Sequence, residues 1–188
     1  MPTELEAKLK IDSHDAVRRA LTAAGAQPVT SVLEHNHILD KPDGSFRAQG
    51  RALRVRHCTA RQGPAPAATL TYKGPTQAAR FKSRTELQVE VADADTTLAI
   101  LQSAGFVVVL LFEKRRETWR LDDCLVELDE LPMLGHYVEI EGPTENAIRN
   151  AQRQLGLDHL DHIRPGYVTL LAQHCAAHHL TDRHISFE

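Results

Sequence analysis

Charged residues two positions apart recur along this chain, and both signs of charge occur in such pairs. Residues i and i+2 of a β-strand project from the same face of a sheet. The acidic pairs are Glu4/Glu6, Glu127/Asp129 and Glu139/Glu141, and the basic pairs are Arg54/Arg56 and Lys114/Arg116. Paired carboxylates offer oxygen ligands to a divalent cation, whereas paired basic side chains can hold phosphate oxygens. The pattern therefore indicates chemistry on metal ions and phosphate groups.

Alternating polar and apolar residues predict the strands that position these pairs. Arg54 and Arg56 alternate with Leu53 and Val55, so one face of that strand is ionic and the other is apolar. Strands are predicted over residues 3–11, 33–40, 51–57, 68–73, 84–91, 106–121, 124–130 and 136–142, and helices over about 13–25, 93–104, 144–156 and 165–180. Because strands are often adjacent and helices are few, we expect an α+β fold with an antiparallel sheet.

Two architectures fit a sheet with one ionic and one apolar face. One is an open sheet with helices on the apolar side and water on the other. The second is a closed barrel with helices outside and charges lining the lumen. Like charges on neighbouring strands would repel one another, whereas a polyphosphate bridged by Mg²⁺ or Mn²⁺ would compensate both signs of charge in a lumen. The residues alone leave both architectures open.

The composition narrows the choice of partners and compartment. Lys and Arg total 22 and Asp and Glu total 25, and this net charge of -3 argues against nucleic acid or a membrane as a partner. No stretch approaches the ~20 apolar residues that span a bilayer. The three cysteines fit neither a disulfide framework nor a metal-binding spacing, so we expect a cytoplasmic location. We also expect one domain over residues 1–188, with a core of about 3–172 and a His-rich tail over 173–188.

Several short motifs occur in an order that is typical of one superfamily. They are Glu4-Leu5-Glu6-Ala7-Lys8, Ala52-Leu53-Arg54-Val55-Arg56, Leu70-Thr71-Tyr72-Lys73, Ser83-Arg84-Thr85-Glu86, Glu113-Lys114-Arg115-Arg116, Leu128-Asp129-Glu130 and Tyr137-Val138-Glu139-Ile140-Glu141. With these motifs the chain resembles the CYTH superfamily, which joins class IV adenylate cyclases and thiamine triphosphatases, and it looks most like the cyclase branch. One departure is Gln88, where the family often has an acidic residue.

The resemblance implies a fold and a set of residue roles. Family members fold as an antiparallel eight-stranded tunnel, so the resemblance favours the closed barrel with a charged lumen and helices outside. By resemblance, the carboxylates that bind Mg²⁺ or Mn²⁺ are Glu4, Glu6, Glu139, Glu141 and Asp129. The implied triphosphate-binding residues are Lys8, Arg54, Arg56, Lys73, Lys82, Arg84, Lys114 and Arg116. For Arg84, a salt bridge with Glu86 inside the lumen is the competing interpretation.

The leading hypothesis is a class IV-like adenylate cyclase that converts ATP to cyclic AMP and pyrophosphate. In this hypothesis Asp129 assists deprotonation of the ribose 3′-hydroxyl or completes a metal shell. Lys114 and Arg116 are its other catalytic residues, because their positive charges neutralise the leaving pyrophosphate.

Two other functions stay open. The same site could use water to hydrolyse thiamine triphosphate, inorganic triphosphate or a nucleoside triphosphate. A polyphosphate- or nucleotide-binding protein without catalysis is the second, although so many carboxylates argue against a pure binder. In each case the expected partner is a small triphosphate such as ATP or thiamine triphosphate, and a homodimer is one option for assembly.

Overall fold

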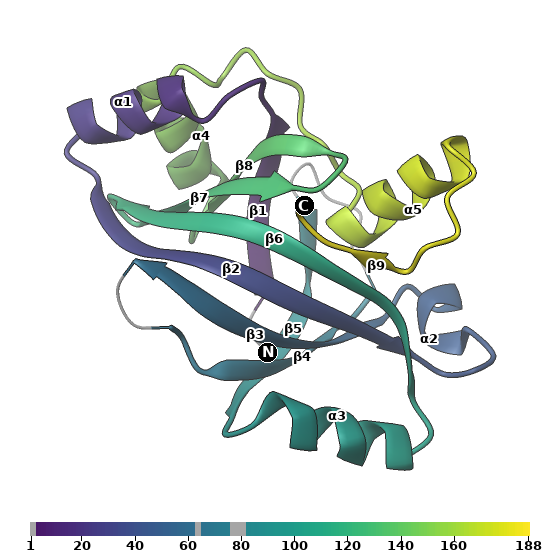
Figure 1. Cartoon of the computed structure of the whole chain (residues 1–188). Helices are drawn as coiled ribbons and strands as arrows, with labels where there is room; N and C mark the ends of the chain where they lie inside the picture. Colours follow the sequence, from purple (N-terminus) through teal and green to yellow (C-terminus); the bar gives the residue numbers. More distant parts are fainter. Residues whose placement is uncertain (1–2, 63–64, 76–81) are drawn as a thin grey trace.

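The computed structural model describes residues 3–62, 65–75 and 82–188. Strands are the most abundant secondary structure, and the helices lie between them (Figure 1). The strands are β1 (Thr3–Lys10), β2 (Gln27–Asp40), β3 (Ala52–Gln62), β4 (Ala68–Lys73), β5 (Lys82–Val91), β6 (Val107–Leu121), β7 (Cys124–Leu131), β8 (Gly135–Glu141) and β9 (His184–Ile185). The helices are α1 (Asp15–Ala23), α2 (Ser45–Ala48), α3 (Ala94–Ser103), α4 (Glu145–Gln154) and α5 (Tyr167–Ala177). The predicted α+β class is confirmed.

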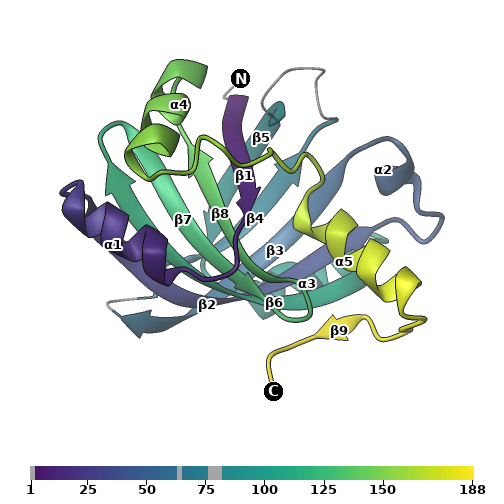
Figure 2. The same ribbon diagram turned by 90° about the horizontal axis from the view of Figure 1, so that it is seen from above.

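The strands form one curled sheet in the order β2-β3-β4-β5-β1-β8-β7-β6-β9, and β2 pairs in addition with β6. Neighbouring strands from β1 to β8 pair antiparallel, whereas β9 pairs parallel with β6. Seen from above, the strands curve around the interior as a half-barrel, with helices along its outside (Figure 2). The curl brings inward-facing residues of distant strands to one place.

The largest apolar core lies outside the sheet, beneath α1 and α4. Leu9 of β1, Val138 and Ile140 of β8, Leu21 of α1 and Ile148 of α4 are all fully buried in it. These sheet residues alternate with charged ones, so the period of two that sends apolar side chains outward sends the charges inward. Burial of the apolar face against helices therefore fixes which way the charges point.

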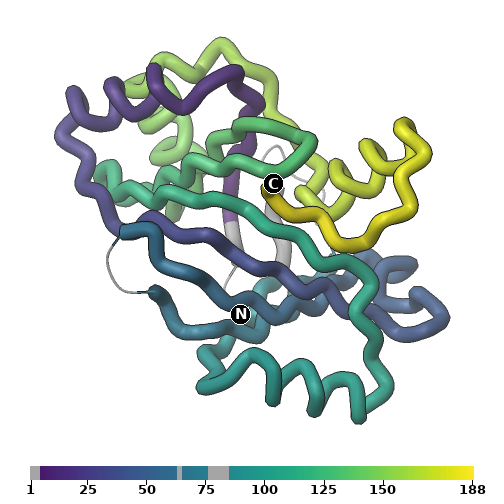
Figure 3. The backbone as a smooth tube through the Cα atoms, viewed as in Figure 1, coloured from purple at the N-terminus to yellow at the C-terminus, as the bar shows by residue number. Residues whose placement is uncertain are grey.

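Two smaller cores complete the packing. Phe112 of β6, Leu171 of α5 and Ile185 of β9 belong to one of them, at the end of the sheet that α5 covers. Leu39 of β2 and Leu98 of α3 belong to the other. After α4 the chain crosses to α5, and the backbone trace shows this crossing (Figure 3). On the way Ile163 donates its N–H to the carbonyl of Lys8 at 2.8 Å, so the crossing segment is fixed to β1.

The predicted strands and longer helices are all present, with changes at their ends. β2 begins at Gln27 rather than at residue 33, because its first part pairs with β6. The sequence did not predict α2 or β9. The Asp40 carboxylate accepts from the Phe46 and Arg47 backbone N–H groups and so supports α2, while β9 has two residues and depends on β6. Both elements depend on tertiary contacts, which local periodicity does not encode.

Among residues 3–62, 65–75 and 82–188, the structure contains no helix that is both long and apolar enough to cross a membrane.

Gly142 allows β8 and α4 to approach each other closely. A Cβ at this position would lie 2.8 Å from the Cys124 Sγ and 3.0 Å from the Ile148 Cγ1. We predict that Gly142→Ala lowers the free energy of unfolding by about 1–3 kcal/mol, because overpacking forces these neighbours apart. Denaturant unfolding of both proteins measures the difference.

The matched control is Gly74→Ala, where the new Cβ would meet Thr85 at an ordinary 3.5 Å. A destabilisation that is as large in the control as in Gly142→Ala would contradict the packing explanation.

Candidate active site

The interior of the curled sheet holds a cavity of about 1050 Å³. Charged side chains of both signs line it, and they come from β1, β2, β3, β4, β5, β6, β7 and β8. The predicted site residues among its lining are Glu6, Lys8, Arg54, Arg56, Lys73, Lys114, Arg116, Glu139 and Glu141. Asp129 is fully buried directly beside them. The structure thus brings together the predicted residues whose side chains it describes.

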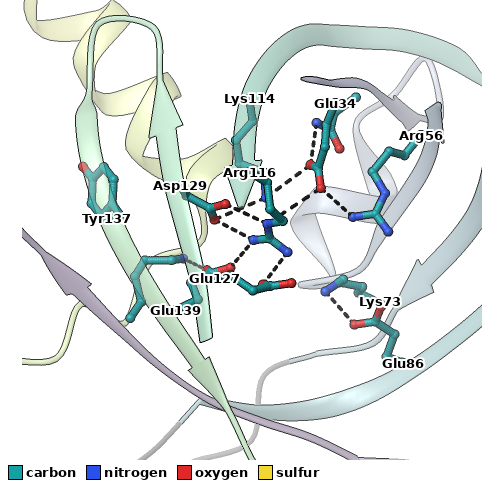
Figure 4. A network of polar contacts seen from close by, with 12 residues as sticks. Glu34, Arg56, Lys73, Glu86, Lys114, Arg116, Glu127, Asp129, Tyr137 and Glu139 are labelled. Carbon is teal, nitrogen blue, oxygen red and sulfur yellow. Dashed lines mark hydrogen bonds and ion pairs between the residues drawn. The ribbon is translucent and has the colours of Figure 1, made fainter. Parts of the chain in front are cut away.

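Arg116 lies at the centre of the network (Figure 4). Its Nε donates to Asp129 Oδ1 at 2.7 Å, its Nη2 donates to Glu139 Oε2 at 2.6 Å, and its Nη1 forms an ion pair with Glu127. Burial alone would lower the pKa of Arg116, but the charges of Asp129, Glu127 and Glu34 hold that pKa well above its usual value. One guanidinium on β6 therefore links carboxylates of β7 and β8.

Glu34 of β2 is a second centre of the network, and the sequence analysis did not single it out. Its carboxylate accepts from Arg56 Nη1 at 2.9 Å and lies 3.2 Å from Lys114 Nζ. It is 1% exposed. Burial alone would raise its pKa, but Lys114, Arg116 and Arg56 hold the pKa of this carboxyl well below its usual range. In the sequence, Glu34 could have been singled out only because Asn36, two positions later, places a second polar side chain on the same strand face. This pattern is weaker than a pair of like charges.

Lys8 connects β1 to β8 and to the segment before α5. Its Nζ lies 3.1 Å from Glu139 Oε1 and donates to the Pro165 carbonyl at 3.2 Å. It also lies 4.0 Å from the centre of the Tyr167 ring, a favourable cation–π contact. Burial, followed by the charges of Asp129 and Glu139, raises the pKa of Tyr167 well above its usual value, so the phenol stays neutral. The sequence analysis assigned Tyr167 no role.

Arg54 is a cation of a different kind. Its Nε is buried, and among the described residues it has no hydrogen-bond acceptor. Burial and the neighbouring Arg56 lower the pKa of Arg54 to about 10, while Glu34 acts in the opposite direction. The lowered pKa means that the charged form of Arg54 is destabilised where it lies. A bound anion would stabilise this positive charge. Lys73, by contrast, already forms an ion pair with Glu86 at 2.5 Å.

The carboxylates near β1 are the candidates for metal binding. Glu6 and Glu141 are cross-strand partners on β1 and β8, and both line the cavity with Glu139. Oxygen donors of this kind suit Mg²⁺ and Mn²⁺. Within the described part of the chain, no three His, Cys, Asp or Glu side chains already converge in a metal-binding arrangement. The donor types fit a divalent ion, and these roles stay predictions.

Three predicted residues have side chains outside the described part of the structure: Glu4, Lys82 and Arg84. Their backbones belong to β1 and β5, where Glu4 pairs with Arg84 and Glu6 pairs with Lys82. The salt bridge proposed for Arg84 and Glu86 therefore stays open.

Comparisons with known proteins give a consistent result. A family model described as the CYTH domain matches residues 2–167. A protein of Methanocaldococcus jannaschii whose name proposes an adenylate cyclase is 28% identical over 138 residues, which cover 73% of this chain and 75% of that protein. The adenylate cyclase CyaB of Aeromonas hydrophila is 27% identical over 144 residues, which cover 76% of this chain and 70% of that protein.

A solved structure has a similar fold at lower sequence identity. It is a Hippeastrum protein that was proposed to be an adenylyl cyclase and is described as having a dominant triphosphatase activity. It matches with a TM-score of 0.71 at 17% identity, over 90% of this chain and 95% of that one.

The titration of Glu127 gives a test of this buried network. Burial raises the pKa of Glu127 from 4.5 to about 7, even though Arg116 opposes the change. A raised folded-state pKa means that the folded protein binds the proton more tightly, so this contribution to stability is lost as pH rises from about 4.5 to about 7. We predict that the free energy of unfolding of Glu127→Gln, relative to that of the wild type, increases as pH rises over this window. Above the window the difference between the two proteins should stay constant.

Thermal unfolding of both proteins from pH 5 to 8 measures this difference. Glu130→Gln is the control on the same strand, because Glu130 pairs with Arg115 in a partly exposed ion pair. A difference between wild type and Glu127→Gln that does not change with pH would contradict the prediction.

Proposed function

Because the chain belongs to the CYTH domain family, we propose that it is a metal-dependent enzyme acting on a triphosphate, and specifically an adenylate cyclase. The reaction converts ATP to cyclic AMP and pyrophosphate. The names of the relatives from M. jannaschii and A. hydrophila support the cyclase assignment. The observation that carries the proposal is the large cavity with both basic and acidic walls.

The cavity suits a nucleoside triphosphate in size and in lining. Small-molecule sites usually occupy about 300–1,000 Å³, and this one has about 1050 Å³. We propose that the curled sheet works as a closed tunnel. The pairing of β2 with both β3 and β6, and of β1 with both β5 and β8, supports this arrangement. Ile38, Phe112 and Val168 supply apolar surface in the same cavity, which supports binding of a nucleobase.

The basic side chains would hold the phosphate groups. Arg54 is the first candidate because its buried Nε lacks an acceptor among the described residues. Lys114 and Arg116 would neutralise the charge that develops on the leaving pyrophosphate, with Lys8, Arg56 and Lys73 beside them. Lys82 and Arg84 complete the proposed set.

The acidic side chains near β1 would hold Mg²⁺ or Mn²⁺. The proposed ligands are Glu4, Glu6, Glu139 and Glu141, with Asp129 as a further candidate. A divalent ion bound there supplies Lewis acidity toward the phosphate oxygens and lowers the pKa of a bound hydroxyl.

In the cyclisation, the ribose 3′-oxygen forms a bond to the α-phosphorus while the bond from that phosphorus to the pyrophosphate oxygen breaks. The proton of the 3′-hydroxyl must pass to a base, and Asp129 is the proposed acceptor. Its contacts with Lys114 and Arg116 also support a second role, because they hold both cations beside the leaving group. Pyrophosphate then leaves with its negative charge still partly neutralised.

Hydrolysis of a triphosphate is the second candidate function. It needs only a bound triphosphate and a placed water, which the charged residues alone could provide. The triphosphatase activity described for the Hippeastrum protein of similar fold favours keeping this candidate.

A product assay separates the candidates. We predict that purified protein with Mg²⁺ or Mn²⁺ converts ATP to cyclic AMP and pyrophosphate. Release of orthophosphate alone from ATP, thiamine triphosphate and inorganic triphosphate would identify a hydrolase instead. Tight binding without metal and without turnover would identify a binding protein.

The proposed metal ligands are tested in the same assay. We predict that Glu6→Gln and Glu139→Gln each reduce kcat/KM by about 10²–10³-fold, because each removes a charge that acts in the transition state. Glu145→Gln is the control, since Glu145 lies in an exposed ion pair with Arg149 on α4. Full activity in the double variant of Glu6 and Glu139 would refute the proposed site.

Arg54 gives a separate prediction about phosphate binding. We predict that Arg54→Gln raises the Kd for inorganic triphosphate by about tenfold or more, because a charge-assisted contact is lost. Arg61→Gln on the exposed end of β3 is the matched control. Titration calorimetry measures both, and equal affinities for the wild type and Arg54→Gln would exclude Arg54 from phosphate binding.

A further inference from the structure

The cations of the cavity differ in how they are neutralised. Lys8 contacts Glu139 of β8, whereas Arg116 contacts carboxylates of β7 and β8 and also lies 3.8 Å from Glu34 of β2. Arg56 of β3 and Lys114 of β6 both contact Glu34 of β2, and Lys114 also lies 3.3 Å from Asp129 of β7. Glu34 is thus the carboxylate between two strands of basic residues, and Lys114 and Arg116 connect it to Asp129 and Glu139 (Figure 4).

Glu34 carries a lasting negative charge at this position. Its side chain is 2% exposed, lines the cavity and accepts a further hydrogen bond from Asn36 Nδ2 at 3.2 Å. The three nearby cations lower the pKa of Glu34, so its carboxyl is ionised at neutral pH. The nitrogen atoms that a phosphate would use are therefore already in contact with an anion.

A fixed anion at a phosphate site has two physical effects. It holds Arg56 and Lys114 in place, which lowers the entropy lost when a ligand binds. It also repels any phosphate that approaches the same nitrogen atoms, because like charges a few ångströms apart interact strongly in a partly buried site. The repulsion matters most for a small product that has few other contacts.

We propose that Glu34 is a positioning residue that acts through Arg56 and Lys114 and weakens the binding of polyphosphate products, so that they leave after turnover. This inference rests on the proposed function. A triphosphate substrate has further contacts, such as Arg54, and tolerates the repulsion better than pyrophosphate does. Glu34 thereby sets the difference in affinity between substrate and product.

The direct test is binding of inorganic pyrophosphate, measured by titration calorimetry in the presence of EDTA so that no metal takes part. Glu34→Gln keeps the size of the side chain and removes its charge. We expect this variant to bind pyrophosphate at least about tenfold more tightly than the wild type does. Glu130→Gln is the control, because it neutralises an ion-paired carboxylate outside the cavity lining. Its affinity should match that of the wild type.

A second variant changes the charge in the opposite direction. Asn36 is fully buried beside Glu34 on the same face of β2. Burial and Glu34 raise the pKa of the new carboxyl in Asn36→Asp, so the measurement is made at pH 8 to 9, where the added charge should weaken pyrophosphate binding by about tenfold. This variant decides the question if Glu34→Gln does not fold.

Steady-state kinetics supply a readout that a purely structural role would not produce. We expect Glu34→Gln to lower both KM and kcat for the triphosphate substrate, because the ligand binds more tightly and the product leaves more slowly. Glu34→Asp keeps the charge and should restore pyrophosphate affinity toward the wild-type value. Pyrophosphate affinity in Glu34→Gln that is unchanged or weaker would overturn the inference.

The two proposals can fail separately. If the wild type turns over no triphosphate while Glu34→Gln still binds pyrophosphate more tightly, the proposed function is wrong and the effect of Glu34 on anion affinity stands. If the wild type is active and Glu34→Gln binds pyrophosphate no better, the function stands and the role of Glu34 is wrong.

Discussion

The structure depends on compensation between opposite charges inside the curled sheet. A buried charge without a partner is strongly destabilising, and Arg116 is buried among carboxylates of β2, β7 and β8. The same strands place their apolar residues outward, beneath α1 and α4. Two demands therefore act on each strand, since one face must satisfy charges and the other must fill a hydrophobic core. A shift of one residue in strand register would violate both together.

The cations of the cavity are not all neutralised by carboxylates to the same extent. Most cations already contact a carboxylate, so their positions are set before any ligand arrives. Such preorganisation is what electrostatic catalysis requires, because the protein then does not need to reorganise as charge develops. Arg54 differs, since its buried Nε has no acceptor within the described residues and its pKa is lowered to about 10. The cavity thus combines cations that carboxylates already hold in place with Arg54, whose positive charge a bound anion could still stabilise.

The sequence predicted much of this arrangement because a period of two is a local property. The strands from β1 to β8 and the common face of Arg54 and Arg56 follow from that period, whereas the direction of this face into a lumen was expected only from the resemblance. The central place of Glu34 does not, since it depends on the register of β2 against β6, and Glu34 pairs with Lys114 across 80 residues of chain. The α2 helix was missed for a related reason, because Asp40 supports it from outside its own sequence. Metal binding and barrel closure stay proposals for this chain: the paired carboxylates and the family resemblance support the first, and the strand pairings and the resemblance support the second.

Lys8 connects two segments that lie far apart in the sequence. It belongs to the first strand, yet its Nζ donates to the carbonyl of Pro165, a partner 157 positions later, and lies over the ring of Tyr167. Contacts between residues so distant in sequence form late, because the loop between them must close first. During synthesis on the ribosome, Lys8 therefore reaches its final surroundings only after the segment with Pro165 and Tyr167 has been made. A nascent chain that stops short of α5 lacks these contacts of Lys8 and the part of the cavity wall that α5 supplies, so the cavity is completed only after α5 has been made.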